Sequence, residues 1–94
     1  MTRVTISLTY NCSNTGVKKA DLRAFVWFFC RYSGLKWVES KSKVNKMGRL
    51  VLNVVVEGWR PELLNDLRTA VRRRFGNCVF VLVRRHRRKN VDGR

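Results

Sequence analysis

The chain has 94 residues, and its 21 lysines and arginines against 6 acidic residues give a formal net charge of +15 at pH 7. At 45% hydrophobic residues, a chain of this length can bury one modest core, which indicates a single domain. A compact chain so rich in positive charge repels itself, and a polyanionic partner is the usual reason for such an excess.

The cysteine pattern argues against a structural metal. Cys12, Cys30 and Cys78 are widely spaced and His86 is the single histidine, whereas a zinc site needs about four ligands, usually in close pairs. We therefore expect no metal, no cofactor and three reduced thiols in a cytoplasmic setting, with Cys30 and Cys78 in the core. The N-terminus lacks the apolar segment of a signal peptide, and the longest apolar run, 24–30, is too short to cross a bilayer.

The first half of the chain predicts a strand, a helix and a second strand. Residues 3–10 alternate apolar and polar side chains, which is typical of a strand. A helix over 18–33 follows a loop of turn-forming residues, and Gly34 suits its C-terminal end. Residues 35–44 form a strand in which interleaved lysines favour an edge position, and a hairpin with Gly48 in the left-handed region follows.

The second half predicts a central strand, a helix and a last strand. Every even position of 49–57 is a branched apolar residue, so this strand is buried on one face and central in a sheet. Pro61 opens a helix that ends at Gly76. Residues 78–83 form a strand that is apolar on both faces, and a polar, basic tail follows it.

The order β-α-β-β-α-β predicts an α+β fold of the ferredoxin-like plait, a four-stranded antiparallel sheet with two helices on one face. The first and third strands lie in the middle, and we expect one domain over 1–84 and a flexible basic tail over 85–94. The uncovered face carries Thr5, Ser7, Thr9, Val51, Asn53 and Val55.

Two segments resemble the helix end and the following strands of acylphosphatases: 33–38 (Ser-Gly-Leu-Lys-Trp-Val) and 54–58 (Val-Val-Val-Glu-Gly). The resemblance covers about half of the chain and implies the same β-α-β-β-α-β fold. That family's catalysis uses an arginine in a phosphate-binding loop and an asparagine after the Trp-Val pair. Residues 11–19 contain no arginine, and Glu39 or Ser40 stands at the asparagine position, so the catalytic pair is not matched.

Two other groups with this layout are compared by residue. RNA-recognition motifs stack bases on aromatic residues of the middle strands, and this chain has threonine, serine, valine and asparagine there. Ferredoxin-like CRISPR-associated and toxin-type nucleases carry an acidic residue just after the first strand, where Tyr10-Asn11 stand here. Since the six acidic residues form no cluster that would hold a metal, we do not expect an enzyme.

The basic residues predict a small nucleic-acid-binding protein that contacts the phosphate backbone of DNA or RNA with little sequence specificity. With 14 arginines against 7 lysines, bidentate phosphate contacts are favoured. Trp37 has two interpretations, stacking on an unpaired base or packing in the hairpin and core. The candidate contacts are Arg72, Arg73, Arg84, Arg85, Arg87, Arg88, Lys89, Lys41, Lys43, Lys46 and Arg49.

The alternative is a non-catalytic adaptor or inhibitor, of the viral or phage accessory type, that binds an acidic surface of a nucleic-acid-processing complex. Its motivation is the unusually apolar first helix, where Trp27, Phe28 and Arg31 lie beside the core stripe. Either a groove between the helices hides both aromatic residues or they form a protein-contact surface. A homodimer through the open sheet face or this helix is also possible, whereas no membrane partner is expected.

Overall fold

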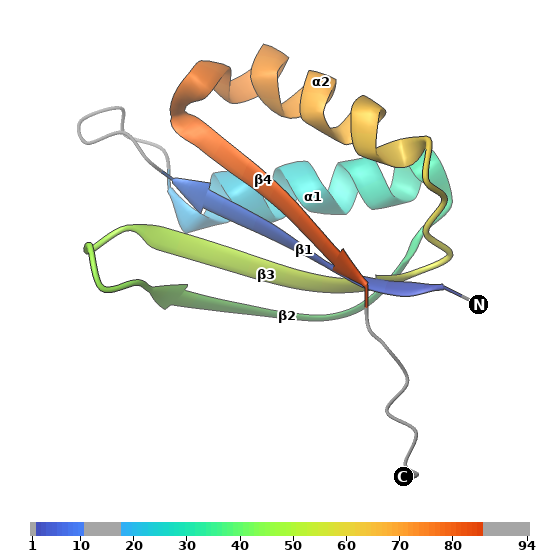
Figure 1. Ribbon diagram of the computed structural model, residues 1–94, viewed down its shortest axis with the longest axis horizontal. Coiled ribbons are helices and arrows are strands. Elements are labelled where there is room, and N and C mark those ends of the chain that lie inside the picture. Colours follow the sequence, from blue (N-terminus) through green and yellow to red (C-terminus); the bar gives the residue numbers. More distant parts are fainter. Residues whose placement is uncertain (1, 11–17, 86–94) are drawn as a thin grey trace, which may run out of the picture.

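The computed structural model describes residues 2–10 and 18–85, and its elements follow the predicted order (Figure 1). The elements are β1 (Arg3–Tyr10), α1 (Lys19–Ser33), β2 (Lys36–Val44), β3 (Leu50–Glu57), α2 (Leu63–Phe75), the short 3-10 helix η1 (Gly76–Cys78) and β4 (Val79–Arg85).

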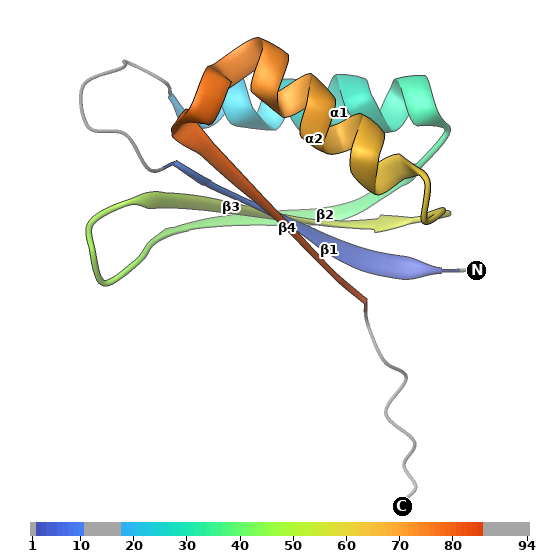
Figure 2. The ribbon, with the colours of Figure 1, turned by 45° about the horizontal axis from the view of Figure 1, so that its top comes forward.

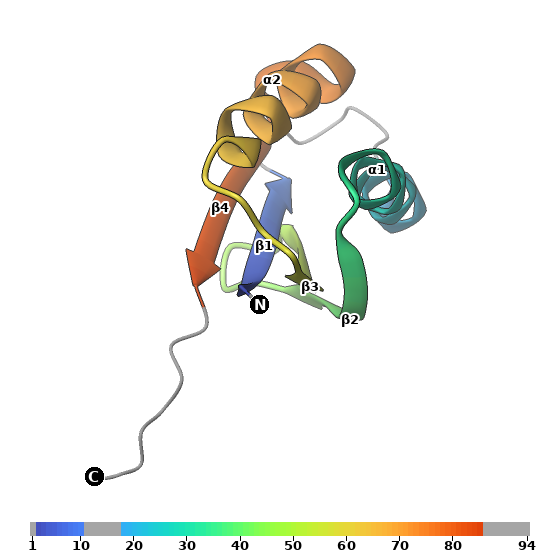
Figure 3. The same ribbon diagram turned by 90° about the vertical axis from the view of Figure 1, so that its right-hand side faces the viewer.

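The four strands form one antiparallel sheet in the order β2-β3-β1-β4. Both helices lie over the same face of this sheet, and the described residues place no helix over its other face (Figures 2 and 3). The ferredoxin-like α+β fold is thereby confirmed. The central positions of β1 and β3 and the edge position of the lysine-bearing β2 agree with the sequence patterns.

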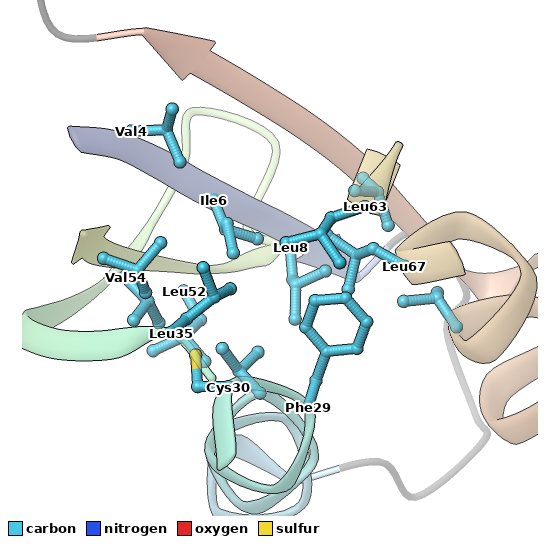
Figure 4. Packing of buried hydrophobic residues seen from close by; sticks show 14 of the residues in the cluster. Val4, Ile6, Leu8, Phe29, Cys30, Leu35, Leu52, Val54, Leu63 and Leu67 are labelled. Carbon is cyan, nitrogen blue, oxygen red and sulfur yellow. The ribbon is translucent and has the colours of Figure 1, made fainter. Parts of the chain in front are cut away.

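The core lies between the sheet and the helices (Figure 4). It forms because alternate residues of a strand point to the same face, and on β1 these are Val4, Ile6 and Leu8, all fully buried. Leu52 and Val54 of β3 join them, since β3 pairs with β1 in a register that places apolar residues opposite one another. This burial is the main source of stability for the fold.

Each helix contributes a stripe of side chains at helical spacing to this core. The α1 stripe is Leu22, Val26, Phe29 and Cys30, and the α2 stripe is Leu63, Leu67 and Val71. The two helices also meet directly, because the rings of Phe25 and Phe75 form an edge-to-face pair with centroids 5.3 Å apart. Gly34 ends α1 with a φ of 73°, as expected from its lack of a Cβ.

The structure corrects the predicted end of the last strand and the predicted state of the cysteines. The last strand, predicted over 78–83, continues to Arg85, because Arg84 and Arg85 pair with Thr5 and Val4 of β1. Cys78 is disulfide-bonded and only half-buried, whereas Cys30 is free and buried, so the prediction of three reduced thiols is wrong. The cytoplasmic setting stays an expectation.

The rest of the predicted tail, 86–94, lies outside the described residues, as do three of its candidate contacts, Arg87, Arg88 and Lys89. Cys12 lies outside them as well. Within the described part of the chain, no helix has the length and apolar character needed to span a membrane.

Candidate nucleic-acid interface

The uncovered face of the sheet is built from rows of residues that lie opposite one another on neighbouring strands. The register of the three strand pairs fixes these rows. From β2 to β4 the rows are Lys43–Val51–Thr9–Phe80, Lys41–Asn53–Ser7–Leu82 and Glu39–Val55–Thr5–Arg84. We call this surface the open face.

Short side chains fill the centre of the open face. Ser7 is buried, and its hydroxyl donates a hydrogen bond to Asn53 Oδ1 at 2.5 Å. This bond gives both the hydroxyl and the amide oxygen a hydrogen-bond partner. Val51 and Val55 are buried beside this pair. The centre of the open face therefore offers only short or buried side chains. The long side chains, Lys41 and Lys43 on β2 and Phe80 and Arg84 on β4, lie at its two edges.

The β2 edge of the open face is basic. Lys41 and Lys43 are exposed and point to the same side, because they are two residues apart on one strand. Asn45 stabilises the following hairpin, because its Oδ1 accepts hydrogen bonds from the backbone N–H of Met47 at 2.9 Å and of Arg49 at 3.0 Å. This hairpin also carries the exposed Lys46, so three candidate lysines extend from one firmly positioned edge.

The second basic group stands at the opposite edge of the sheet. Arg72, Arg73 and Arg74 form the last turn of α2, where cations are favoured by the helix dipole. The guanidinium of Arg74 lies over the Phe75 ring, 5.2 Å from its centroid, while the candidate contacts Arg72 and Arg73 are exposed. Arg84 reaches the open face from β4, and Arg85, one residue on, has the opposite orientation.

A groove of about 300 Å³ lies between α2, η1 and β4 at this edge. Two arginines one helical turn apart on α2, Arg68 and Arg72, line its helix side. The full lining is Arg68, Val71, Arg72, Gly76, Asn77, Val79, Phe80 and Val81. A small basic groove of this kind suits an anionic group such as a phosphate.

The structure does not gather all the candidate basic residues into one patch. The β2 lysines lie on the open face at one edge, whereas the α2 arginines lie on the helix layer above the other edge. The order β2-β3-β1-β4 places two strands between them. Sequence spacing could not reveal this separation, because it follows from the pairing of strands that are distant along the chain.

Phe80 and Leu82 were not among the predicted site residues. Both stand on the open face at β4, and the Phe80 side chain is 61% exposed. The sequence could have indicated them, because residues 78–83 are apolar on both faces of the strand. Since alternate residues point to opposite faces of the sheet, half of these apolar side chains had to face away from the helices. Trp37 has the other orientation: it lies opposite Val56 on the helix side and packs against the core, which confirms the packing interpretation.

The outer side of α1 is aromatic. Trp27, Phe28 and Tyr32 are 44%, 64% and 92% exposed, so the expectation that a groove between the helices hides Trp27 and Phe28 is wrong. The two rings form an edge-to-face pair with centroids 5.2 Å apart, and the Arg31 guanidinium lies 5.3 Å from the Trp27 centroid. The core stripe needs only the inner side of α1, which leaves this aromatic surface to solvent.

Several acidic residues serve the fold locally. Asp21 Oδ2 accepts a hydrogen bond from the backbone N–H of Lys18 at 3.0 Å at the start of α1. Glu57 pairs with Arg3 on the neighbouring strand, where Arg3 Nε donates to Glu57 Oε2 at 3.1 Å, and this hydrogen bond lowers the pKa of Glu57. Within residues 2–10 and 18–85, no group of three or more metal-ligating side chains is present.

Comparison with known proteins supports the fold alone. No protein-family model and no curated protein matches the sequence. Among solved structures, the chain is similar to an ACT domain protein from Streptococcus pneumoniae, with a TM-score of 0.65 and 12% sequence identity over 89% of each chain. This likeness shows that the four-stranded plait with two helices is a known, ACT-domain-like arrangement.

Proposed function

We propose that the protein binds nucleic acid through the phosphate backbone. The observation that carries this proposal is the position of exposed basic side chains around the open face, with Lys41 and Lys43 at one edge and Arg84 at the other. The groove with Arg68 and Arg72 lies beside that second edge. Positive charge therefore predominates at both edges, with Glu39 as the one acidic side chain in the three rows of the open face, and this charge complements a polyanion.

Backbone contacts also determine the expected behaviour of the complex. Lysine and arginine side chains that neutralise phosphates release condensed counterions, so the affinity falls steeply as the salt concentration rises. Such contacts position a nucleic acid but do not read its bases, and we expect little sequence preference. We propose binding without catalysis.

Fluorescence anisotropy tests this proposal. Labelled DNA and RNA of unrelated sequences, single- and double-stranded, are titrated with the protein over a salt series. We expect submicromolar affinity at physiological salt and a steep linear fall of the logarithm of the association constant with the logarithm of the salt concentration. Affinity no better than the nonspecific range of roughly 10⁻⁴ to 10⁻⁶ M for all four probes would overturn the proposal.

A second function is favoured by the aromatic surface of α1. Trp27, Phe28 and Tyr32 are exposed on the same helix as the exposed Arg23 and Arg31, so this surface suits an acidic partner protein with apolar anchors. The protein would then act as an adaptor or inhibitor of a nucleic-acid-processing complex, alone or together with nucleic-acid binding. Trp27→Ala should abolish capture of such a partner from nuclease-treated lysate while nucleic-acid affinity stays unchanged. Capture that survives Trp27→Ala would exclude this surface.

A further inference from the structure

Phe80 is an exposed aromatic residue that lies between the lysines of β2 and the arginines of α2. It stands on the open face at the β4 edge, in the same row as Thr9, Val51 and Lys43. We infer that the open face binds single-stranded nucleic acid and that Phe80 stacks on one unpaired base. This inference rests on the proposed nucleic-acid binding and adds to it the form of the ligand and a contact with a base.

The surroundings of Phe80 leave its ring accessible. Its direct cross-strand neighbour is the small Thr9, and β4 is an edge strand with no further strand beyond it among the described residues. Leu82, two residues along the same strand, adds half-exposed apolar surface beside the ring. Aromatic side chains in such positions stack on bases of any sequence, because every base has a π-face.

Charge on both sides of Phe80 favours a nucleic acid as the occupant. Three strand spacings separate β4 from β2, so Lys43 starts about 14 Å from Phe80 along the same row. A strand that places one base on Phe80 and crosses the low centre of the open face would bring its phosphates to Lys41 and Lys43. Arg84, two strand positions beyond Leu82, adds a cation on the Phe80 side.

Phe80 also links the two basic groups that the topology separates. It lines the groove that contains Arg68 and Arg72, and its side chain belongs to the open face. The chain of a nucleic acid stacked there can therefore continue around the β4 edge into that groove. One aromatic contact thus joins the lysines of β2 to the arginines of α2 along a single path.

The requirement for an unpaired base separates single strands from duplexes. In a duplex the bases are stacked on each other, and extracting one costs unstacking and unpairing energy. We therefore expect Phe80 to contribute to the affinity for single strands and little to the affinity for duplexes, whose contacts are with phosphates alone.

The chain offers a matched control for the test. Phe28 has nearly the same exposure as Phe80, 64% against 61%, but lies on α1 in the helix layer. Phe80→Ala and Phe28→Ala are compared with the wild type by anisotropy, using labelled single strands of about 15 nucleotides and the corresponding duplexes, as DNA and as RNA. Phe80→Tyr keeps a stacking ring, and thermal unfolding checks that every variant is folded.

We expect Phe80→Ala to weaken single-strand binding by about 5- to 150-fold, with duplex affinity within about a factor of two of the wild type. Phe28→Ala and Phe80→Tyr should bind single strands as the wild type does. A wild type that binds nucleic acid while Phe80→Ala behaves like Phe28→Ala would overturn this inference and leave the proposed function standing. A wild type that binds none of the probes would overturn the proposed function itself.

Two further outcomes are decisive. Equal losses for single strands and duplexes would mean that Phe80 acts through the shape of the β4 edge rather than through a base, and would overturn the inference. Dissociation of a dimer by Phe80→Ala without any change in single-strand affinity would assign the open face to a second copy of the chain. A preference between the DNA and RNA arms, with the Phe80 effect retained, would support the inference and identify the ligand.

Discussion

Removal of the two open-face lysines should change the salt dependence of binding by a predictable amount. Lys41 and Lys43 are exposed, lie two residues apart on β2 and point to the same side of the sheet. A single strand that crosses the open face from Phe80 would meet both, so Lys41→Ala/Lys43→Ala removes two phosphate contacts. Because both side chains are exposed, the free energy of unfolding of the variant should lie within about 0.5 kcal/mol of the wild-type value.

The expected magnitude follows from counterion release. Each phosphate contact with a single strand contributes about −0.7 to the slope of the logarithm of the association constant against the logarithm of the salt concentration. Losing two contacts should flatten this slope by about 1.4. The affinity should fall most at low salt, where each released counterion contributes most, and the two binding curves should converge as salt rises.

Lys19→Ala/Arg23→Ala is the matched control. It also removes two exposed cations, but from α1, on the helix layer away from the open face. Net charge falls equally in both variants, so a general effect of charge would flatten both slopes alike. Equal slopes for the two double variants would refute the placement of the phosphates on the open face.

Three predictions concern the fold and its titrating groups. Leu67→Ala should lower the free energy of unfolding by about 2 to 5 kcal/mol in chemical denaturation, because Leu67 is fully buried in the core; a loss below about 1 kcal/mol would contradict its place there. Burial raises the pKa of the Cys30 thiol to about 11, so peptide mapping at pH 8 should find Cys30 alkylated only after unfolding. Modification in the folded protein at the rate of the unfolded chain would contradict that. Because Arg3 lowers the pKa of Glu57, the ion pair stabilises the fold above the ordinary carboxyl pKa and is lost as the pH falls through the lowered value. The difference in the free energy of unfolding between the wild type and Glu57→Gln should therefore be largest at neutral pH and vanish in acid. A difference that persists at pH 2, about two units below the ordinary carboxyl pKa, would count against the ion pair.

The parts of the fold that the sequence predicted are those with local signals. Residues 3–10 alternate without interruption, and β1 has those bounds. Gly34 and Gly76 mark the ends of the two helices because each lies at positive φ, which an L side chain disfavours. The order of the elements then predicted the ferredoxin-like plait, which buries one apolar face of the central strands and the inner stripe of each helix.

The features that the sequence did not predict depend on partners distant along the chain. Arg84 and Arg85 have the composition of a tail, and only their pairing with β1 makes them part of β4. The exposure of Trp27 and Phe28 depends on where α2 packs, which local apolarity cannot indicate. The bonded state of Cys78 is likewise set by the tertiary structure.

Of the residues in the proposed site, the basic ones were candidates from the sequence and the aromatic one was not. Lys41, Lys43 and Arg84 were identified because basic residues are evident in any sequence. Phe80 was missed because its strand is apolar on both faces, and such a pattern does not indicate which residues face away from the helices.

An NMR titration of the isotope-labelled protein with an unlabelled single strand tests the central claim most directly, because it reports which surface binds. We predict that the largest amide shift changes fall on Lys41 and Lys43 of β2, on residues 80–84 of β4, and on the last turn of α2. Changes confined to the aromatic surface of α1, around Trp27 and Phe28, would contradict nucleic-acid binding by the open face.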